Sequence, residues 1–411
     1  MLICRSTFVP DICSRAPTVT TNILRSQVVA VAAVSTCATL PMFLVGALGV
    51  QLRSDLGIEL AQFGLLSSVY YASGVCFAVG AGWAAEVLGS VLAMRFALIL
   101  DAVLLLLLAA IAATWWAFAA LLVIGGIANA LAQPSTNLHL AVNVSVADQG
   151  RAFGIKQSSV PMAALIGGLA VPTIGLTIGW RYAFAAGAVL SAGSLALVRG
   201  PSAKLVRTQG RRTECSTGML VAMGVGAGLG SSGAVTLGIF MVSGAVEIGI
   251  AEGAAGIVLA VASLASIAAR VTSGFRVDSQ QTDHLRLVGF MMLAGVAGFA
   301  LLATGRPSLY TIGAVGAFCF GWGWPAVFVL SVVKLNPSAP GFATSITQAG
   351  AACGSVIGPM SFGRIADSVG FRYAWLAAGC SMGAGAVLIG LISVSLQKNP
   401  VVVPDSHCRV T

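Results

Sequence analysis

Three hydrogen-bonding side chains recur at helical spacing inside an apolar segment of the chain. Asn129, Gln133 and Thr136 stand at positions i, i+4 and i+7, so a helix would place them on one face. Amides surrounded by apolar groups need hydrogen-bond partners, which a bound solute or a neighbouring helix can supply. The spacing therefore favours a face that lines a solute cavity. The alternative is hydrogen bonding between helices that only assembles the protein.

Two charged residues also lie in apolar segments. Asp101 occurs within FALILDAVLLLLLAA, and Lys156 stands near the start of another apolar segment. A carboxyl group in such a place is a candidate proton-coupling site. For Asp101 we favour instead a hydrogen-bonded structural acid, or one that its apolar surroundings keep protonated. A cavity-facing Lys156 would favour an anionic solute. The interpretation that we favour for Lys156 is a side chain that extends past the edge of its apolar segment to water.

Serines and tryptophans add further candidates for a cavity lining. Ser231 and Ser232 lie together in one apolar segment, and Trp322 and Trp324 precede Pro325 in another. A hydroxyl or an indole N–H can hold a polar solute, but an indole ring also fills a core well. For the two tryptophans we favour packing in the core over binding.

The elements that must position these residues are transmembrane helices. Of the 411 residues, 57% are hydrophobic and 9% are charged, and the mean hydropathy is +0.95, whereas a soluble domain carries about 25% charged residues. Apolar runs of roughly 17–25 residues, long enough to cross a bilayer, recur along the chain. The twelve predicted spans are 27–50, 61–84, 93–113, 115–139, 153–176, 180–198, 216–243, 252–273, 287–304, 309–333, 343–366 and 373–396.

The distribution of basic residues predicts the orientation. With a cytoplasmic N-terminus, most of the 22 Lys and Arg residues fall in the inside segments, as topology requires. This accounts for the formal net charge of +9 without a nucleic-acid surface. We expect an integral protein of a plasma membrane, the inner membrane of a bacterium, with both termini in the cytoplasm.

No motif of an enzyme stands out in the chain. There is no phosphate-binding loop, no H-E-x-x-H and no G-x-S-x-G, and the three histidines are far apart. The nine cysteines form no C-x-x-C pair. We therefore expect no enzymatic activity, no cofactor and no metal site. Because the sequence has no phosphate-binding loop, ATP-driven transport is also excluded.

A repeat divides the chain into two halves. GWRYAF at 179–184 returns as GFRYAW at 370–375, and the stretches 152–184 and 343–375 share ten identities. A repeat of this length indicates duplication. The predicted parts are a cytoplasmic tail (1–26), a six-helix bundle (27–198), a basic loop (199–215), a second six-helix bundle (216–397) and a tail (398–411). Gln157 and Gln348 occupy equivalent positions, which suggests a symmetric role in binding or in bridging the halves.

The chain resembles the major facilitator superfamily over residues 27–397. The residues that carry the resemblance are GWAAEVLGSVLAMR at 82–95, its partner RVTSGFRVD at 270–278, and GRAFGIKQSSVPMAALIGG at 150–168. The resemblance implies an all-α membrane protein with twelve transmembrane helices in two pseudo-symmetric bundles. It also implies a central site lined mainly by spans one, four, seven and ten.

The resemblance implies that the two related loops form a gate at the cytoplasmic face. Glu86 and Asp278 are acids that can accept hydrogen bonds from a nearby helix N-terminus, and Arg95 and Arg270 are their candidate partners. Such a latch would hold the halves together in the outward-open state. Val87 departs from the family pattern, which usually has a basic residue there. The predicted gating residues are Gly82, Glu86, Gly89, Arg95, Arg270, Gly274 and Asp278.

These observations predict a secondary active transporter that moves a small polar or anionic solute by alternating access, coupled to a proton or another ion. One alternative is a drug/proton antiporter that exports many compounds. Another, of a different class, is a passive channel or a receptor that transports nothing. The expected partners are the solute, the coupling ion and the lipid bilayer, and we expect a monomer that binds no nucleic acid.

Overall fold

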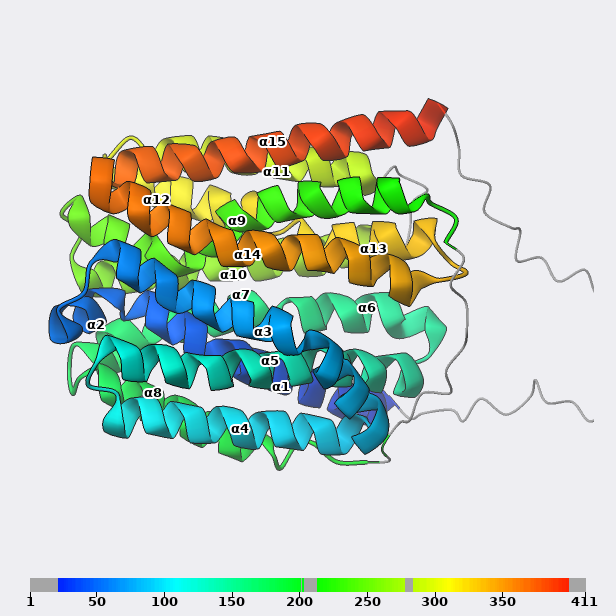
Figure 1. The fold of residues 1–411 in the computed structure, drawn as a ribbon, viewed down its shortest axis with the longest axis horizontal. Coiled ribbons are helices and arrows are strands. Elements are labelled where there is room, and N and C mark those ends of the chain that lie inside the picture. The colour runs from blue at the N-terminus through cyan, green and yellow to red at the C-terminus, as the bar shows by residue number, and fades with distance from the viewer. Residues whose placement is uncertain (1–20, 201, 203–212, 278–283, 399–411) are drawn as a thin grey trace, which may run out of the picture.

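The computed structural model describes residues 21–200, 202, 213–277 and 284–398, and its regular elements there are all helices (Figure 1). They follow the predicted spans in order. The elements are α1 (Thr21–Ala47), α2 (Gly49–Leu56), α3 (Leu60–Leu88), α4 (Ser90–Ile111), α5 (Trp115–Asn143), α6 (Val146–Gln157), α7 (Ser159–Ala170), η1 (Val171–Gly175), α8 (Trp180–Ser194), α9 (Thr217–Glu247), α10 (Glu252–Val277), α11 (His284–Leu302), α12 (Pro307–Gly316), η2 (Ala317–Gly321), α13 (Pro325–Leu335), α14 (Pro340–Val369) and α15 (Phe371–Lys398).

Ten of the described helical segments are long and apolar enough to cross a membrane. The other two predicted spans correspond to α8, which has only 15 residues, and to α14, a 30-residue helix rich in Gly, Ser and Thr. The axes of both lie roughly along those of the longer helices beside them (Figure 1). The chain is therefore an integral membrane protein with an all-helical fold.

Two predicted spans are interrupted helices. The fifth consists of α6, α7 and the π-helical turn η1, with a break at Ser158. The tenth consists of α12, the π-helical turn η2 and α13, which restarts at Pro325. Proline lacks the backbone N–H that a continuous helix needs and is tolerated in the first turn, so the helix begins anew there. Short π-helical turns of this kind are frequent at functional sites.

The first predicted span was placed too far along the chain. Helix α1 ends at Ala47, and the separate short helix α2 follows from Gly49. The end of the fold that carries α2 is called the far end here, and the opposite end, where α15 finishes at Lys398, is called the terminal end (Figure 1). Helices α1–α8 occupy one side of the molecule in this view and α9–α15 the other. They are called the first and the second set of helices.

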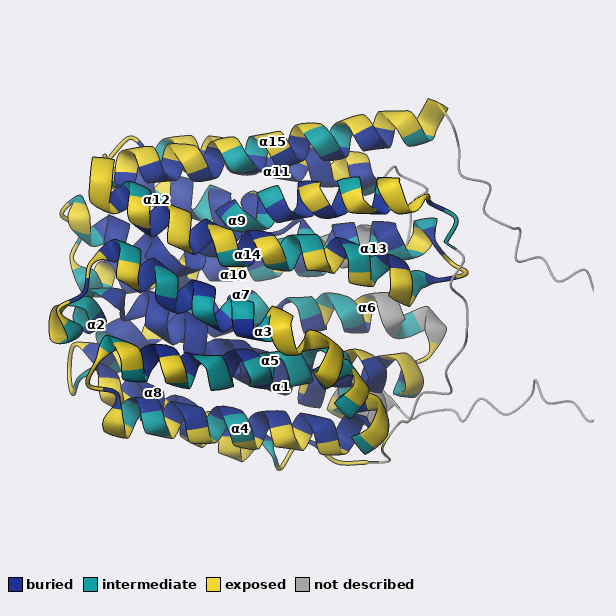
Figure 2. Cartoon of the chain, viewed as in Figure 1, coloured by how far each residue is buried: buried dark blue, intermediate teal, exposed yellow. Residues whose placement is uncertain are grey.

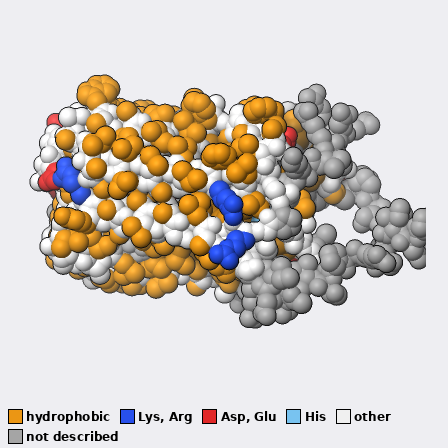
Figure 3. Space-filling model, turned by 90° about the horizontal axis from the view of Figure 1, so that it is seen from below, with side chains coloured by type: hydrophobic (Ala, Val, Ile, Leu, Met, Phe, Trp, Pro, Cys, Tyr) orange, Lys and Arg blue, Asp and Glu red, His pale blue; other side chains and the backbone are white. Residues whose placement is uncertain are grey.

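The surface of the molecule is apolar, as a lipid-facing surface must be. Exposed large side chains include Val79, Trp116 and Leu391, and charged side chains are sparse on the face shown in Figure 3. Buried residues concentrate on the inward faces of the helices (Figure 2). The charge-poor composition is thus explained by lipid, which replaces water around most of the protein.

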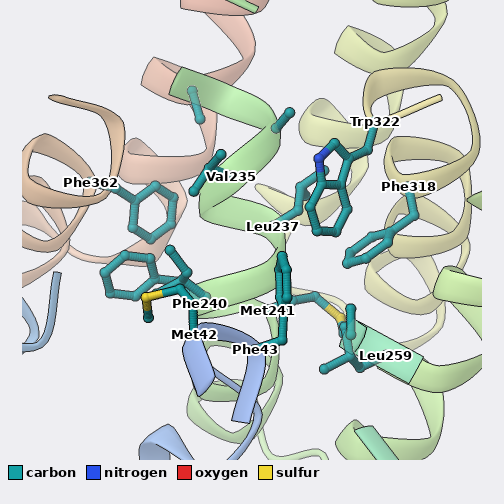
Figure 4. Packing of buried hydrophobic residues seen from close by; sticks show 14 of the residues in the cluster. Met42, Phe43, Val235, Leu237, Phe240, Met241, Leu259, Phe318, Trp322 and Phe362 are labelled. Atoms are coloured by element: carbon teal, nitrogen blue, oxygen red, sulfur yellow. The ribbon is translucent and has the colours of Figure 1, made fainter. Parts of the chain in front are cut away.

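Aromatic residues from both sides of the molecule meet in the centre (Figure 4). The ring of Phe43 on α1 lies 5.3 Å from that of Trp322, which follows η2. Phe63 on α3 meets Phe240 on α9 edge to face, with ring centroids 5.7 Å apart, and Phe240 stacks on Phe362 of α14 at 4.6 Å. This packing joins the two sets of helices through apolar contacts.

Candidate solute site and gates

A buried lysine lies against two amide side chains of the fourth span. The Nζ of Lys156, on α6, donates to Oε1 of Gln133 at 2.8 Å and to Oδ1 of Asn137 at 2.7 Å, both on α5. Gln133 in turn donates to Oδ1 of Asn129 at 3.1 Å. Only 5% of Lys156 is exposed. We call Lys156, Asn129, Gln133 and Asn137 the Lys156 cluster.

The cluster corrects the sequence interpretation at two positions. Lys156 does not extend to the edge of the membrane, because its ammonium is held inside by α5. Thr136 is fully buried and bonds back to the carbonyl oxygens of Ala132 and Gln133 of its own helix. The polar face continues instead at Asn137, which sequence reasoning missed. Its i+8 spacing from Asn129 is the signal that would have found it.

The charge of Lys156 is not neutralised by the described residues. No described carboxylate lies within 4.0 Å of its Nζ, and both partners are neutral amides. An ammonium removed from water costs several kcal/mol unless an opposite charge compensates it. Two of its three N–H groups have partners, which leaves one for another acceptor. The arrangement suits a bound anion.

The prediction that Arg270 belongs to a cytoplasmic gating loop is wrong, because Arg270 lies in the interior. It is 2% exposed, and its Nε and Nη2 donate to the carbonyl oxygen of Trp322 while Nη1 donates to that of Gln157. Gln157 is the last residue of α6 and follows Lys156 directly. Arg270 therefore links α10 to the interruption of the fifth span, beside the Lys156 cluster.

The remaining candidates for the lining lie elsewhere. Trp322 packs on Phe43 and Phe318, and Trp324 is 1% exposed beside Phe328, so both indoles are buried in the core. Ser232 shares a hydrogen bond of 2.7 Å with Ser381.

Ser232 opens on a pocket of about 150 Å³ between α9, α14 and α15. Ile357 also lines this pocket and is 55% exposed, so the pocket faces the outer surface. Ser231 is half-buried next to it, and Gln348 is exposed on α14 without a hydrogen bond to Gln157. The structure therefore does not join these residues to the Lys156 cluster.

Asp101 lies inside the first set of helices. It is fully buried on α4, and its Oδ2 accepts a hydrogen bond of 2.6 Å from Ser191 of α8. No described residue bonds its Oδ1. This hydrogen bond joins α4 to α8 and includes no residue of the Lys156 cluster, so it fits a hydrogen-bonded structural acid.

The predicted cytoplasmic latch is not formed among the described residues. Glu86 is exposed, and Arg95 donates to the carbonyl oxygen of Val198 at 3.1 and 2.8 Å instead of pairing with Glu86. Gly89 ends α3 with φ +80°, and a side chain on Gly82 would meet open space. Gly274 lies within α10, and Asp278 falls outside the described residues.

A stretch in the terminal half of α3 stands apart from its neighbours. Six consecutive residues, 75–80, are exposed, and Val79 is 87% exposed. Six residues cover more than a full turn of an α-helix, so no neighbouring helix covers this stretch on any side. The far half of α3, by contrast, packs closely on α14.

Two equivalent contacts close the far end. A side chain on Gly64 of α3 would collide with the carbonyl oxygen of Pro359 on α14, and a Cβ on Gly256 of α10 would lie 2.6 Å from that of Gly168 on α7. The offsets are 192 for the two glycines of α3 and α10 and 191 for their partners. We call these contacts the α3/α14 seam and the α7/α10 seam. The internal repeat thus appears in the structure as a pair of matching backbone contacts.

Comparison with known proteins supports this architecture. The family model described as Major Facilitator Superfamily matches residues 31–217. A crystal structure of a mutant of the nucleoside transporter NupG has a TM-score of 0.71 at 14% identity, over 90% of this chain and 99% of that one.

A bacterial homologue of the human lysosomal transporter Spinster, crystallised in an inward-facing and occupied conformation, has a TM-score of 0.66 at 14% identity. The match covers 91% of this chain and 96% of the chain of that homologue. At such low identity both similarities describe the fold. A search of curated protein sequences found no significant match.

Proposed function

We propose that the chain is a transporter of the Major Facilitator Superfamily, whose family model matches residues 31–217, and that it moves a small polar or anionic solute across the membrane by alternating access as a secondary active transporter. The proposal includes coupling to a proton or another ion. It also places the protein in a bacterial inner membrane with the terminal end in the cytoplasm, in agreement with the distribution of basic residues.

The observation that carries the proposal is the buried ammonium of Lys156 between two neutral amide oxygens. An uncompensated charge in a membrane-embedded bundle is costly and is typical of a substrate pathway. An anion that binds there supplies the missing charge and the missing acceptor together. A bulky organic cation would be repelled, which favours the anionic solute over drug export.

In this mechanism the Lys156 ammonium attracts the anion, and Asn137 and Gln133 orient the ammonium through their side-chain oxygens. The Nδ2 of Asn137 is a second donor beside the same site. Arg270 fixes the backbone that carries Lys156 from the opposite side, through the carbonyl of Gln157. Binding at this point is therefore sensitive to the separation of the two sets of helices.

Alternating access requires that one end close while the other opens. The close contacts of the α3/α14 and α7/α10 seams lie at the far end, and the exposed stretch of α3 lies toward the terminal end. This combination is expected of an inward-facing state if the terminal end is cytoplasmic. The latch expected from Glu86 would then form in the opposite state.

The proposal can be tested by a thermal-shift screen of the purified protein against small carboxylates, inorganic anions and bulky cations. A ligand that binds only the folded protein raises the melting temperature. Small anions should stabilise the wild type and fail to stabilise Lys156→Gln. The control is Lys334→Gln, which removes an exposed lysine of α13 and should respond as the wild type does. Stabilisation by bulky cations alone would refute the proposal in favour of drug export.

A further inference from the structure

The first turn of α3 is completed by an acid from the opposite side of the molecule. A helix leaves its first four N–H groups without partners inside the helix. In α3, counted from the cap residue, the N–H of Glu59 donates to Oε1 of Gln62 at 3.2 Å, and that of Gln62 bonds to the Glu59 side chain. Asp367 of α14 accepts the other two, from Leu60 at 3.0 Å and from Ala61 at 2.6 Å.

Backbone packing places Asp367 at this position. A side chain on Gly363, one turn earlier in α14, would collide with the carbonyl oxygen of Leu60. Further along the same seam, Ser68 of α3 donates to the carbonyl oxygen of Val356 at 2.6 Å. The cap therefore forms only while α3 and α14 are in backbone contact at the far end.

Two further polar interactions cross the far end. Gln51 of α2 donates to Glu252 of α10 at 2.9 Å. Burial lowers the pKa of Arg53 on α2, and the nearby carboxylates of Asp367 and Glu247 oppose that effect. In these contacts the donors lie on α2 and α3, and the acids that face them lie on α9, α10 and α14. Opposite partial and full charges attract the two sides to each other.

The second seam lacks such a cap. The repeat places Leu176 at the position equivalent to Asp367, with an offset of 191. Leu176 packs near Gly253, at the start of α10, through its side-chain methyl group. The two seams therefore share their backbone contacts but differ in polarity. When they separate, water can hydrate the N–H groups and the carboxylate of one seam, whereas the other exposes apolar groups.

We propose that Asp367 and the first turn of α3 form a latch between the two bundles, which holds the far end closed and sets the balance between the two access states. This inference rests on the alternating access of the proposed function, and it assigns a controlling residue far from the Lys156 cluster. A charged cap on a helix N-terminus is worth enough to shift such a balance by about tenfold.

Hydrogen exchange of the full-length protein in lipid nanodiscs, without any solute, tests the latch. In Asp367→Ala, exchange should become faster in peptides that cover 60–68 and 356–366 and slower in peptides that cover 75–83, because the terminal end closes as the far end opens. Gly363→Ala should do the same through steric pressure on Leu60. The control is Ser368→Ala, whose hydroxyl bonds only within its own helix turn.

Faster exchange confined to the first turn of α3, with 75–83 unchanged in both variants, would show a local cap and overturn the latch. The measurement needs no ligand, so it stands apart from the test of the solute site. If no anion binds the wild type but the reciprocal change is present, the solute proposal fails and the latch does not.

Discussion

The Nζ of Lys156 lies 2.7 Å from Oδ1 of Asn137, within the interior of a membrane protein and without a described carboxylate nearby. The pairing joins the fourth and fifth spans at the interruption between α6 and α7. Its electrical imbalance is the feature from which the account of transport follows.

Supplying the missing charge from within the protein should abolish anion binding. In Asn137→Asp the new carboxylate would form an ion pair with Lys156 and occupy the place of the anion. We expect the apparent affinity for small anions to fall at least about tenfold. The melting temperature of the unliganded protein should be maintained or raised. Thermal-shift titrations of both proteins measure this, and undiminished anion affinity in Asn137→Asp would contradict the assignment.

Arg270 should contribute to stability through both of its carbonyl partners. A lysine in its place keeps the charge but cannot reach two carbonyl groups with a planar fork of donors. We expect Arg270→Lys to lower the melting temperature by several degrees, since loss of a buried charged hydrogen bond costs about 1.5–3 kcal/mol. An unchanged melting temperature would show that the contacts to Trp322 and Gln157 carry little energy.

Asp101 should prove dispensable for coupling. Its one described partner is Ser191, within the first set of helices, so we expect Asp101→Asn to retain flux of the solute with the same pH dependence. Asparagine keeps the size of the side chain and an acceptor oxygen for Ser191. Flux measured in proteoliposomes at two pH values decides the point, and loss of the pH dependence would identify Asp101 as the coupling site.

Glu214 should add a small stability term that depends on pH. The side chain of Ser338 and, to a smaller extent, its backbone N–H, which lies 3.0 Å from Oε1, interact with the Glu214 carboxylate and lower the pKa of Glu214 below its usual value. A lowered pKa in the folded state contributes stability above the unfolded pKa, and this contribution is lost as the pH falls through the folded pKa. The melting temperatures of the wild type and Glu214→Gln should therefore differ near neutral pH and converge in acid. A constant difference at all pH values would assign the effect to packing.

Sequence reasoning predicted the fold because long apolar segments and a duplicated motif are properties of the chain itself. The equivalence of residues 152–184 and 343–375 returns as two matching seams, although the contacts at Gly64 and Gly256 could not be foreseen. Close approach of helix backbones depends on how helices pack, and many glycines in the chain face open space. The interruption at Ser158 was likewise not visible in the apolar pattern.

The candidate site was predicted only in part. Gln133 and Asn129 were found by their spacing, whereas Asn137 was missed and Thr136 was included, because both stand within reach of the same helical face. Lys156 was expected at the membrane edge, since a long side chain usually extends to water when it can. Two amides on the neighbouring helix changed that outcome, and their position relative to Lys156 depends on tertiary structure. Arg270 was assigned to a loop because it begins a family-like motif, but it lies inside α10.

Solute counterflow in proteoliposomes tests the central claim most directly. Vesicles are loaded with the unlabelled anion that gives the largest thermal shift, and uptake of the labelled anion is followed. We expect transient accumulation above equilibrium for the wild type and for Lys334→Gln, and none for Lys156→Gln. Equal counterflow in Lys156→Gln would contradict the role of Lys156, and simple equilibration by the wild type would indicate a channel instead of a transporter.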